Sequence, residues 1–271
     1  MAEPSYSDKE GTNLPSLSSA LNFAIEEVSS SPLKATKSLT TLLERTSSLQ
    51  LFSKNETLQD VATSHIPLLS IEHHLALSLI ASPTSSSIDR HVNVVRAVDL
   101  FHSFLRKLDN MDALKPDIQK EYHHVLDMDD NDNEEEMNES MSRMHKSQHL
   151  GESREQKIAR FKLKRAAEEE VSRLRALHDR RTRLSAEPEE EIDGYDDDGI
   201  KRTYNIAGLH RCSVEAIDEI LTALREIEML KMAVQMERQR EVMDKYTGAK
   251  VSKGILIRFY FSICYTWYAK F

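Results

Sequence analysis

Residues 88–108 read IDRHVNVVRAVDLFHSFLRKL, and this stretch decides the fold class. Its apolar side chains recur mainly at steps of three and four residues, which places most of them on one face of an α-helix. The predicted face consists of Val92, Val95, Val98, Leu100, Phe101, Phe104, Leu105 and Leu108. Asp89 stands where a side chain can cap the first turn. We therefore expect a helix that begins near Asp89 and buries its apolar face.

The same spacing covers the chain on both sides of this helix. Upstream, it predicts helices from Leu17, from Pro32 to about Thr46, and from Asn55 to Ile80. Downstream, a proline at position 116 opens a further short helix that ends at about position 126. Helices of this length joined by short loops are typical of an antiparallel array, so the sequence predicts an all-α fold.

Beyond this array the charge pattern divides the chain. Residues 127–136 contain seven acids, and residues 152–184 contain eleven lysines and arginines against six acids, a net charge of +5. Runs of acids are typically solvated and flexible. We expect the following segments: a disordered N-terminus 1–16, a helical bundle 17–126, an acidic flexible insert 127–151, a basic helix 152–184, an acidic linker 185–212, a C-terminal helix 213–247 and an atypical aromatic tail 248–271.

Composition excludes several classes of function. The chain has 271 residues, a net charge of −9, only 7 Gly and only 2 Cys. It contains no Gly-rich phosphate-binding motif, no HExxH and no paired CxxC, so we expect no catalytic residues, no cofactor and no metal. The adjacent pairs His73-His74 and His123-His124 do not change this, since neighbouring side chains on a helix point about 100° apart.

The targeting signals are also weak. The first 30 residues carry five acids and no long apolar run, which argues against a secretory signal peptide, and we expect a cytoplasmic protein. Residues 251–271 hold seven aromatic side chains. Their apolar run from position 255 has 17 residues, including Arg258 and Lys270, whereas a membrane span needs about 20 apolar residues. We therefore expect no membrane association.

The basic helix is the main candidate for a binding surface. Arg154 and Lys157 lie on one helical face, and Lys157, Arg160 and Lys164 form a second row at steps of three and four residues. Such a surface can dock a carboxylate-rich protein, in which case charge sets orientation and association rate. Two alternatives are a solvated helix held by Glu–Arg pairs and an RNA-binding helix, although the net charge of −9 disfavours RNA. Another alternative is a helical scaffold or coiled-coil adaptor that uses the spacing of Ile217, Ile220, Leu224 and Ile227.

Three stretches resemble, in order along the chain, the characteristic segments of the Tap/alpha-four family, the non-catalytic regulators of type 2A protein phosphatases. Residues 153–162 (SREQKIARFK) are similar to the family pattern R-x-x-K-I-x-[RK]-[FY]-K. Residues 51–63 (LFSKNETLQDVAT) resemble its L-F-S-x-N-E-x-x-x-[DE]-[IV]-x-T run, and residues 224–230 (LREIEML) resemble its C-terminal helical segment. Together these matches cover about residues 20–245.

The resemblance implies an N-terminal tetratricopeptide-like bundle similar to 14-3-3 proteins. It also implies direct binding to type 2A phosphatase catalytic subunits, with those of types 4 and 6 as further candidates, which stabilises or sequesters them in TOR-linked signalling. The family's phosphatase-contacting basic pair falls on Arg154 and Lys157, and Lys162 and Arg165 are further candidates in the same stretch. We expect a monomer that binds no nucleic acid.

This chain departs from the family at its C-terminal tail. Family chains end in a polar tail with an acidic motif that contains Gly, Arg and Asn, which residues 251–271 lack. Because the matching segments precede this tail, we expect phosphatase binding to be retained. We interpret the stretch 51–63 as a packing element, with Leu58, Val61 and Ala62 in the core.

Overall fold

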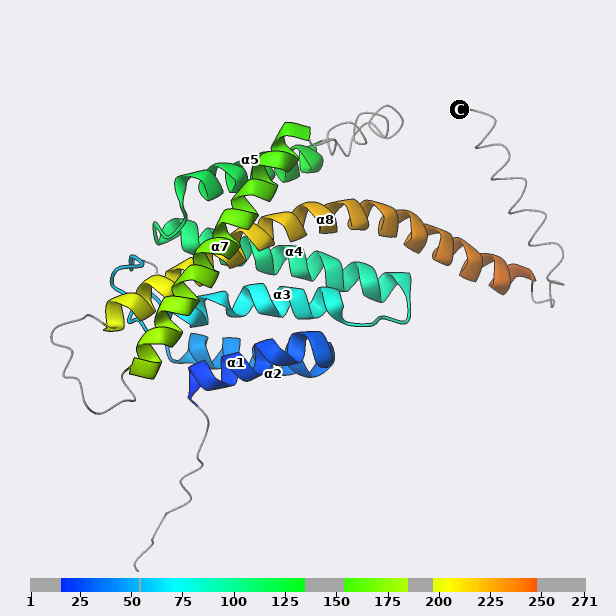
Figure 1. Ribbon diagram of the computed structural model, residues 1–271. Coiled ribbons are helices and arrows are strands. Elements are labelled where there is room, and N and C mark those ends of the chain that lie inside the picture. The colour runs from blue at the N-terminus through cyan, green and yellow to red at the C-terminus, as the bar shows by residue number, and fades with distance from the viewer. Residues whose placement is uncertain (1–15, 54, 135–153, 185–196, 248–271) are drawn as a thin grey trace, which may run out of the picture.

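The computed structural model describes residues 16–53, 55–134, 154–184 and 197–247, and every regular element in these ranges is a helix (Figure 1). The all-α fold class is therefore confirmed. The elements are α1 (Leu17–Ser30), α2 (Pro32–Ser48), the 3₁₀-helix η1 (Ile66–Ser70), α3 (Ile71–Ala81), α4 (Ser87–Asn110), α5 (Pro116–Glu134), α7 (Arg154–Leu184) and α8 (Asp197–Thr247). The predicted N-terminal segment and the aromatic tail lie outside the described residues, apart from residue 16.

Helix α3 is the central layer of the bundle. It packs against α2 on one side and α4 on the other, and α8 covers α4 (Figure 1). This position explains why α3 is buried nearly all round, including Glu72 and His73 as well as Leu75. The buried Glu72 carboxylate accepts hydrogen bonds from Ser103 (3.0 Å) and Lys107 (2.7 Å) of α4, which offset the cost of taking its charge out of water.

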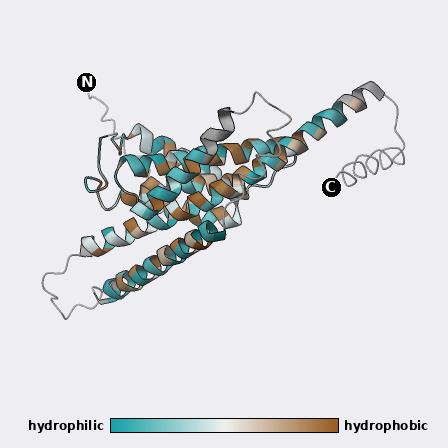
Figure 2. Cartoon of the chain, turned by 90° about the horizontal axis from the view of Figure 1, so that it is seen from above, coloured by the Kyte–Doolittle hydropathy of each residue, from teal (hydrophilic) through white to brown (hydrophobic). Residues whose placement is uncertain are grey.

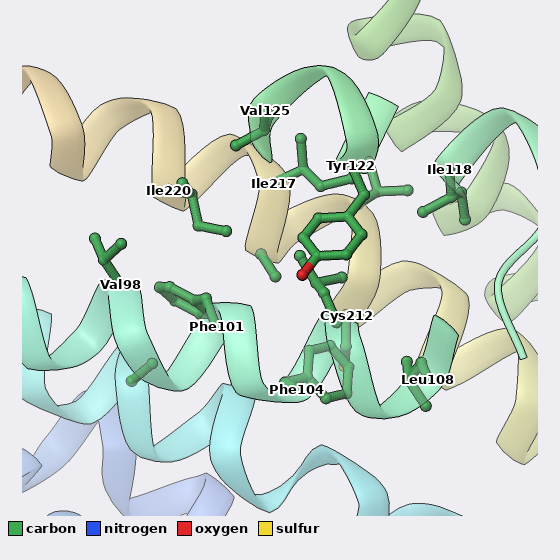
Figure 3. Packing of buried hydrophobic residues seen from close by; sticks show 14 of the residues in the cluster. Val98, Phe101, Phe104, Leu108, Ile118, Tyr122, Val125, Cys212, Ile217 and Ile220 are labelled. Atoms are coloured by element: carbon green, nitrogen blue, oxygen red, sulfur yellow. The ribbon is translucent and has the colours of Figure 1, made fainter. Parts of the chain in front are cut away.

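The larger part of the core lies where α4, α5 and α8 meet (Figure 3). Tyr122 of α5 lies close to Phe101 and Phe104 of α4 and to Ile217 of α8, and all four side chains are almost completely buried. A second, smaller cluster joins α1 and α2 to α3. The sequence-predicted face of α4 is therefore largely in the core, but Val92 at its beginning is 57% exposed.

The N-terminal cap of α4 differs from the predicted one. Ser86, rather than Asp89, is the capping residue, and its hydroxyl accepts a hydrogen bond from the backbone N–H of Asp89 at 3.0 Å. The Asp89 carboxylate in turn accepts a hydrogen bond from the Ser86 hydroxyl at 2.8 Å. Asp89 thus lies in the first turn, where a negative charge also complements the helix dipole.

The predicted helix from Asn55 is wrong in its first part, because turns occupy the segment before η1. Side chains of this segment bond to nearby backbone instead: Glu56 accepts from the N–H of Ser53 and Asp60 accepts from that of Thr57, each at 3.0 Å. Such local hydrogen bonds compete with helix formation. The packing prediction holds for Val61, which is 2% exposed, and Leu58 packs against the core, whereas Ala62 is exposed.

Two segments predicted as non-helical are helical at their edges. Helix α5 continues into the acidic insert as far as Glu134, and α8 begins at Asp197, inside the predicted acidic linker. Extending a helix that already exists needs no new nucleation, so polar residues can continue it. The early start of α8 is also held by tertiary contacts. Arg202 donates to the carbonyls of Leu58 (2.6 Å) and Val61 (2.7 Å) in the turn segment.

The far end of α8 projects from the bundle (Figures 1 and 2). Four methionines on this part are more than half exposed, namely Met229, Met232, Met236 and Met243. In the described ranges, no helix is both long enough and apolar enough to cross a membrane.

Arg90 joins α4 to α8 and provides a test of this packing. Its guanidinium donates two hydrogen bonds to Glu226 (2.6 and 2.9 Å) and one to the carbonyl of Ile80. Arg90→Lys keeps the charge but cannot reproduce the two-pronged contact, so we expect urea denaturation to show a free energy of unfolding lower by about 1–2 kcal/mol. Arg175→Lys is the control, because Arg175 forms only a loose, exposed pair with Asp179. This substitution should change the free energy of unfolding by less than about 0.5 kcal/mol.

The contact between His73 of α3 and Glu215 of α8 should make the stability of the fold sensitive to acid. Their side chains lie 3.4 Å apart, and His73, helped by Arg211, holds the pKa of Glu215 at about 2 although burial opposes this. Because the folded-state pKa is below the unfolded one, Glu215 stabilises the fold above pH about 4.5 and loses this effect as the pH falls toward 2. Between pH 5 and pH 2, the free energy of unfolding should therefore fall more for the wild type than for Glu215→Gln. Glu168→Gln, at an exposed position, should follow the wild type.

Candidate docking face on helix α7

A polar contact fixes α7 against α8. Arg160 of α7 is only 9% exposed, and its guanidinium donates a hydrogen bond of 2.5 Å to the Asp218 carboxylate of α8. Lys164, one turn further along α7, places its ammonium 3.4 Å from the other oxygen of the same carboxylate. One acid on α8 therefore pairs with two cations on the inner side of α7.

Further contacts hold α7 along its length. Near its beginning, Gln156 is hydrogen-bonded to His124 of α5 at 3.0 Å. In the middle, Glu170 accepts a hydrogen bond of 2.6 Å from Lys115, while the nearly buried Ala167 and Leu174 contribute apolar packing. These contacts lie on the same side of the helix as Arg160, so the opposite side faces solvent.

All four sequence-predicted site residues lie on this solvent side. Arg154, Lys157, Lys162 and Arg165 are exposed. The predicted second row of cations is wrong as a single surface, because Arg160 and Lys164 point to Asp218 while Lys157 stays in solvent. Periodicity alone could not separate them, since it does not reveal which side of a basic helix meets a carboxylate.

Two exposed apolar side chains lie among these cations, and sequence reasoning did not assign them to the site. Ile158 is 43% exposed and Phe161 is 65% exposed. Steps of three and four residues connect them to the basic residues, so they form one continuous patch. We call this patch the α7 outer face, and it consists of Arg154, Lys157, Ile158, Phe161, Lys162 and Arg165.

The charges of the α7 outer face are largely available to a partner. Arg165 pairs with Glu169 at 2.9 Å, but both side chains are more than two-thirds exposed, which makes the pair weak. Within the part of the chain that the structure describes, Arg154, Lys157 and Lys162 form no ion pair. The face can therefore present cations to carboxylates without first breaking a strong internal pair.

The bundle itself also contains a recess on its surface. This recess of about 590 Å³ is lined by residues of α1 and α2. These two helices lie on the side of the bundle opposite the beginning of α7 (Figure 1). The lining of the recess includes Phe23, Lys37 and Arg45. In the described residues there is no group of three or more His, Cys, Asp or Glu side chains arranged to hold a metal ion.

The side chains proposed for a coiled-coil seam are used inside the molecule. Ile217, Ile220 and Ile227 are buried in the main core, and Leu224 packs against it. They are therefore not available to pair with another helix while the bundle is folded.

Comparisons with known proteins are consistent with this architecture. A sequence model of the TAP42-like family matches residues 13–254. Among solved structures, one described as the structure of the Tap42 alpha4 subunit has a similar fold, with a TM-score of 0.58 and 20% sequence identity. The match covers 80% of this chain and 98% of that one. The comparison with curated proteins found no match.

The Asp218 contact predicts how α7 can be loosened. Asp218→Ala removes the carboxylate that Arg160 and Lys164 share, so we expect the free energy of unfolding to fall by about 2 kcal/mol. Backbone amides of α7 should exchange with deuterium faster, as measured by mass spectrometry of peptides from residues 154–184. Asp179→Ala removes an exposed partner at 3.9 Å and should alter neither quantity measurably. Unchanged exchange in Asp218→Ala would contradict the proposed anchoring.

Proposed function

We propose that this chain, which belongs to the TAP42-like family of phosphatase-associated regulators, binds the catalytic subunits of type 2A Ser/Thr protein phosphatases through its α7 outer face. The observation that carries the proposal is the position of Arg154 and Lys157. Both are exposed on a helix whose opposite side is fixed by Asp218. The orientation of the two cations relative to the bundle is therefore fixed.

The chemistry of the face favours an acidic protein partner. Exposed cations on one side of a helix attract carboxylates, which accelerates association and sets the orientation of the complex. A rigid helix also loses little conformational freedom on binding. Catalytic subunits of types 4 and 6 are further candidate partners, provided that they carry a similar acidic surface.

Binding of this kind would regulate the phosphatase without chemistry from the regulator. We propose that the chain acts as a cytoplasmic monomer that stabilises or sequesters the catalytic subunit in TOR-linked signalling. In this arrangement α7 completes the phosphatase-binding domain formed with the bundle.

RNA binding is the second candidate function for the same helix. The exposed cations would attract phosphates, but the net charge of the chain is −9, and the exposed Glu155, Glu168 and Glu169 are interspersed with them. Carboxylates next to the cations repel a phosphate backbone. A protein partner is preferred because it can also cover the exposed Ile158 and Phe161, as apolar and aromatic contacts at protein interfaces do.

Charge reversal on the α7 outer face tests the proposal. In a binding assay with purified phosphatase catalytic subunit, Arg154→Glu/Lys157→Glu should lower the affinity at least tenfold, about 1.4 kcal/mol, because carboxylates would then face carboxylates. Circular dichroism should be unchanged, since both side chains are exposed.

The matched control is Arg180→Glu/Arg183→Glu, which makes the same charge change at exposed positions near the other end of α7. It should bind like the wild type apart from a small long-range effect. Equal loss in both variants would indicate a general charge effect and contradict the assigned site. Failure of the folded wild type to bind the catalytic subunit would overturn the proposed function itself.

A further inference from the structure

Ile158 and Phe161 are exposed without serving the packing of α7. The inner side of the helix has its own apolar contacts through Leu163, Ala167 and Leu174. Phe161, by contrast, leaves 65% of its surface in solvent. Single exposed apolar residues are common, but this pair lies one turn apart and is surrounded by four cations.

The surroundings of the pair distinguish it from Leu177, the other exposed large apolar residue in the described part of α7. Leu177 of α7 is also exposed (46%), but its one apolar neighbour at a step of three or four residues, Leu174, is buried, so Leu177 has no second exposed apolar side chain beside it. Among the described side chains of α7, only the outer face combines an exposed aromatic side chain, a second exposed apolar side chain and flanking arginines. Aromatic residues and arginine are the types most enriched at the energetic centre of protein interfaces.

We infer that Ile158 and Phe161 are the apolar anchors of the phosphatase contact and that Arg154, Lys157, Lys162 and Arg165 form its charged rim. This inference rests on the proposed function and adds a requirement for the partner. The acidic surface of the catalytic subunit must contain an apolar recess wide enough for a phenyl ring, bordered by carboxylates. The cations then select and orient the partner, and the buried ring supplies most of the lasting affinity.

Charge pairs and apolar contacts are expected to contribute differently, because water and salt affect the two kinds of contact differently. Exposed charge pairs contribute little once they are solvated and screened. An apolar ring gains free energy in proportion to the surface removed from water, and this gain does not depend on opposite charges. Salt concentration therefore separates the two contributions.

The test measures binding of the full-length chain to purified type 2A catalytic subunit at about 0.1 M and about 1 M salt, over which the Debye length falls from about 10 Å to about 3 Å. Phe161→Ser should lower the affinity by about 30-fold at both salt concentrations, the effect of a central interface residue. Ile158→Ser should cause a smaller loss. The loss caused by Arg154→Glu/Lys157→Glu should shrink at high salt.

Two controls isolate the apolar contact. Phe161→Leu keeps an apolar side chain and should retain most of the affinity. Leu177→Ser makes a comparable change at another exposed site of the same helix and should bind like the wild type. The free energy of unfolding should be unchanged in Phe161→Ser, since the ring is mostly exposed in the unbound protein.

Two results would overturn the inference. If Phe161→Ser binds like the wild type while the charge reversal abolishes binding, the contact is electrostatic alone, although the proposed function stands. If Phe161→Ser lowers the free energy of unfolding of the unbound protein, the ring is covered by this chain's own residues. Failure of the wild type to bind would instead reject the proposed function, so the two failures are distinguishable.

Discussion

The Asp218 carboxylate of α8 turns two cations of α7 away from the solvent, and further contacts on the same side of the helix support this orientation. Asp218 pairs with Arg160 and Lys164, so both cations are turned inward. On a helix with 3.6 residues per turn, fixing one side fixes every other side chain. Apolar packing alone would define this rotation poorly, because few α7 side chains are buried. Arg160, Ala167 and Leu174 are the buried ones among the described positions. The availability of Arg154 and Lys157 is thus a consequence of the contacts on the opposite side of the helix.

Helix α8 connects this surface to the rest of the bundle. Its first turns hold the turn segment before η1 through Arg202 and through Asn205, which donates to the carbonyl of Thr63. Its middle fills the main core against α4, and the same turns carry Asp218. The stretch 51–63, which carries one of the sequence resemblances, therefore stabilises the beginning of the helix that positions α7. The stretch 51–63, α8 and α7 are far apart in sequence, but contacts connect them in the fold.

The sequence predicted what local periodicity can reveal. The beginning of α1 and the burial of Phe101 and Phe104 follow from apolar residues at helical spacing, the beginning of α2 from Pro32, and the range of α7 from the charge pattern. The sequence-based prediction failed where contacts between distant residues determine the secondary structure. The first turns of α8 contain a glycine and two acids, and hydrogen bonds from Arg202 and Asn205 to carbonyls more than a hundred residues upstream hold these turns in place. Four site residues came from a family resemblance, whereas the exposure of Ile158 and Phe161 required the position of α8.

The mixed character of the α7 outer face argues for recognition of a protein. A nucleic-acid surface gains most from cations without nearby acids, because each carboxylate repels the phosphates. In a helix that only faces water, an exposed phenyl ring costs free energy because it remains hydrated. Here cations and two apolar side chains occur together, and the contacts of α7 with α8 present them in a fixed orientation. A partner with a matching pattern of carboxylates around an apolar recess satisfies all of these groups at once, and neither a phosphate backbone nor bulk water does.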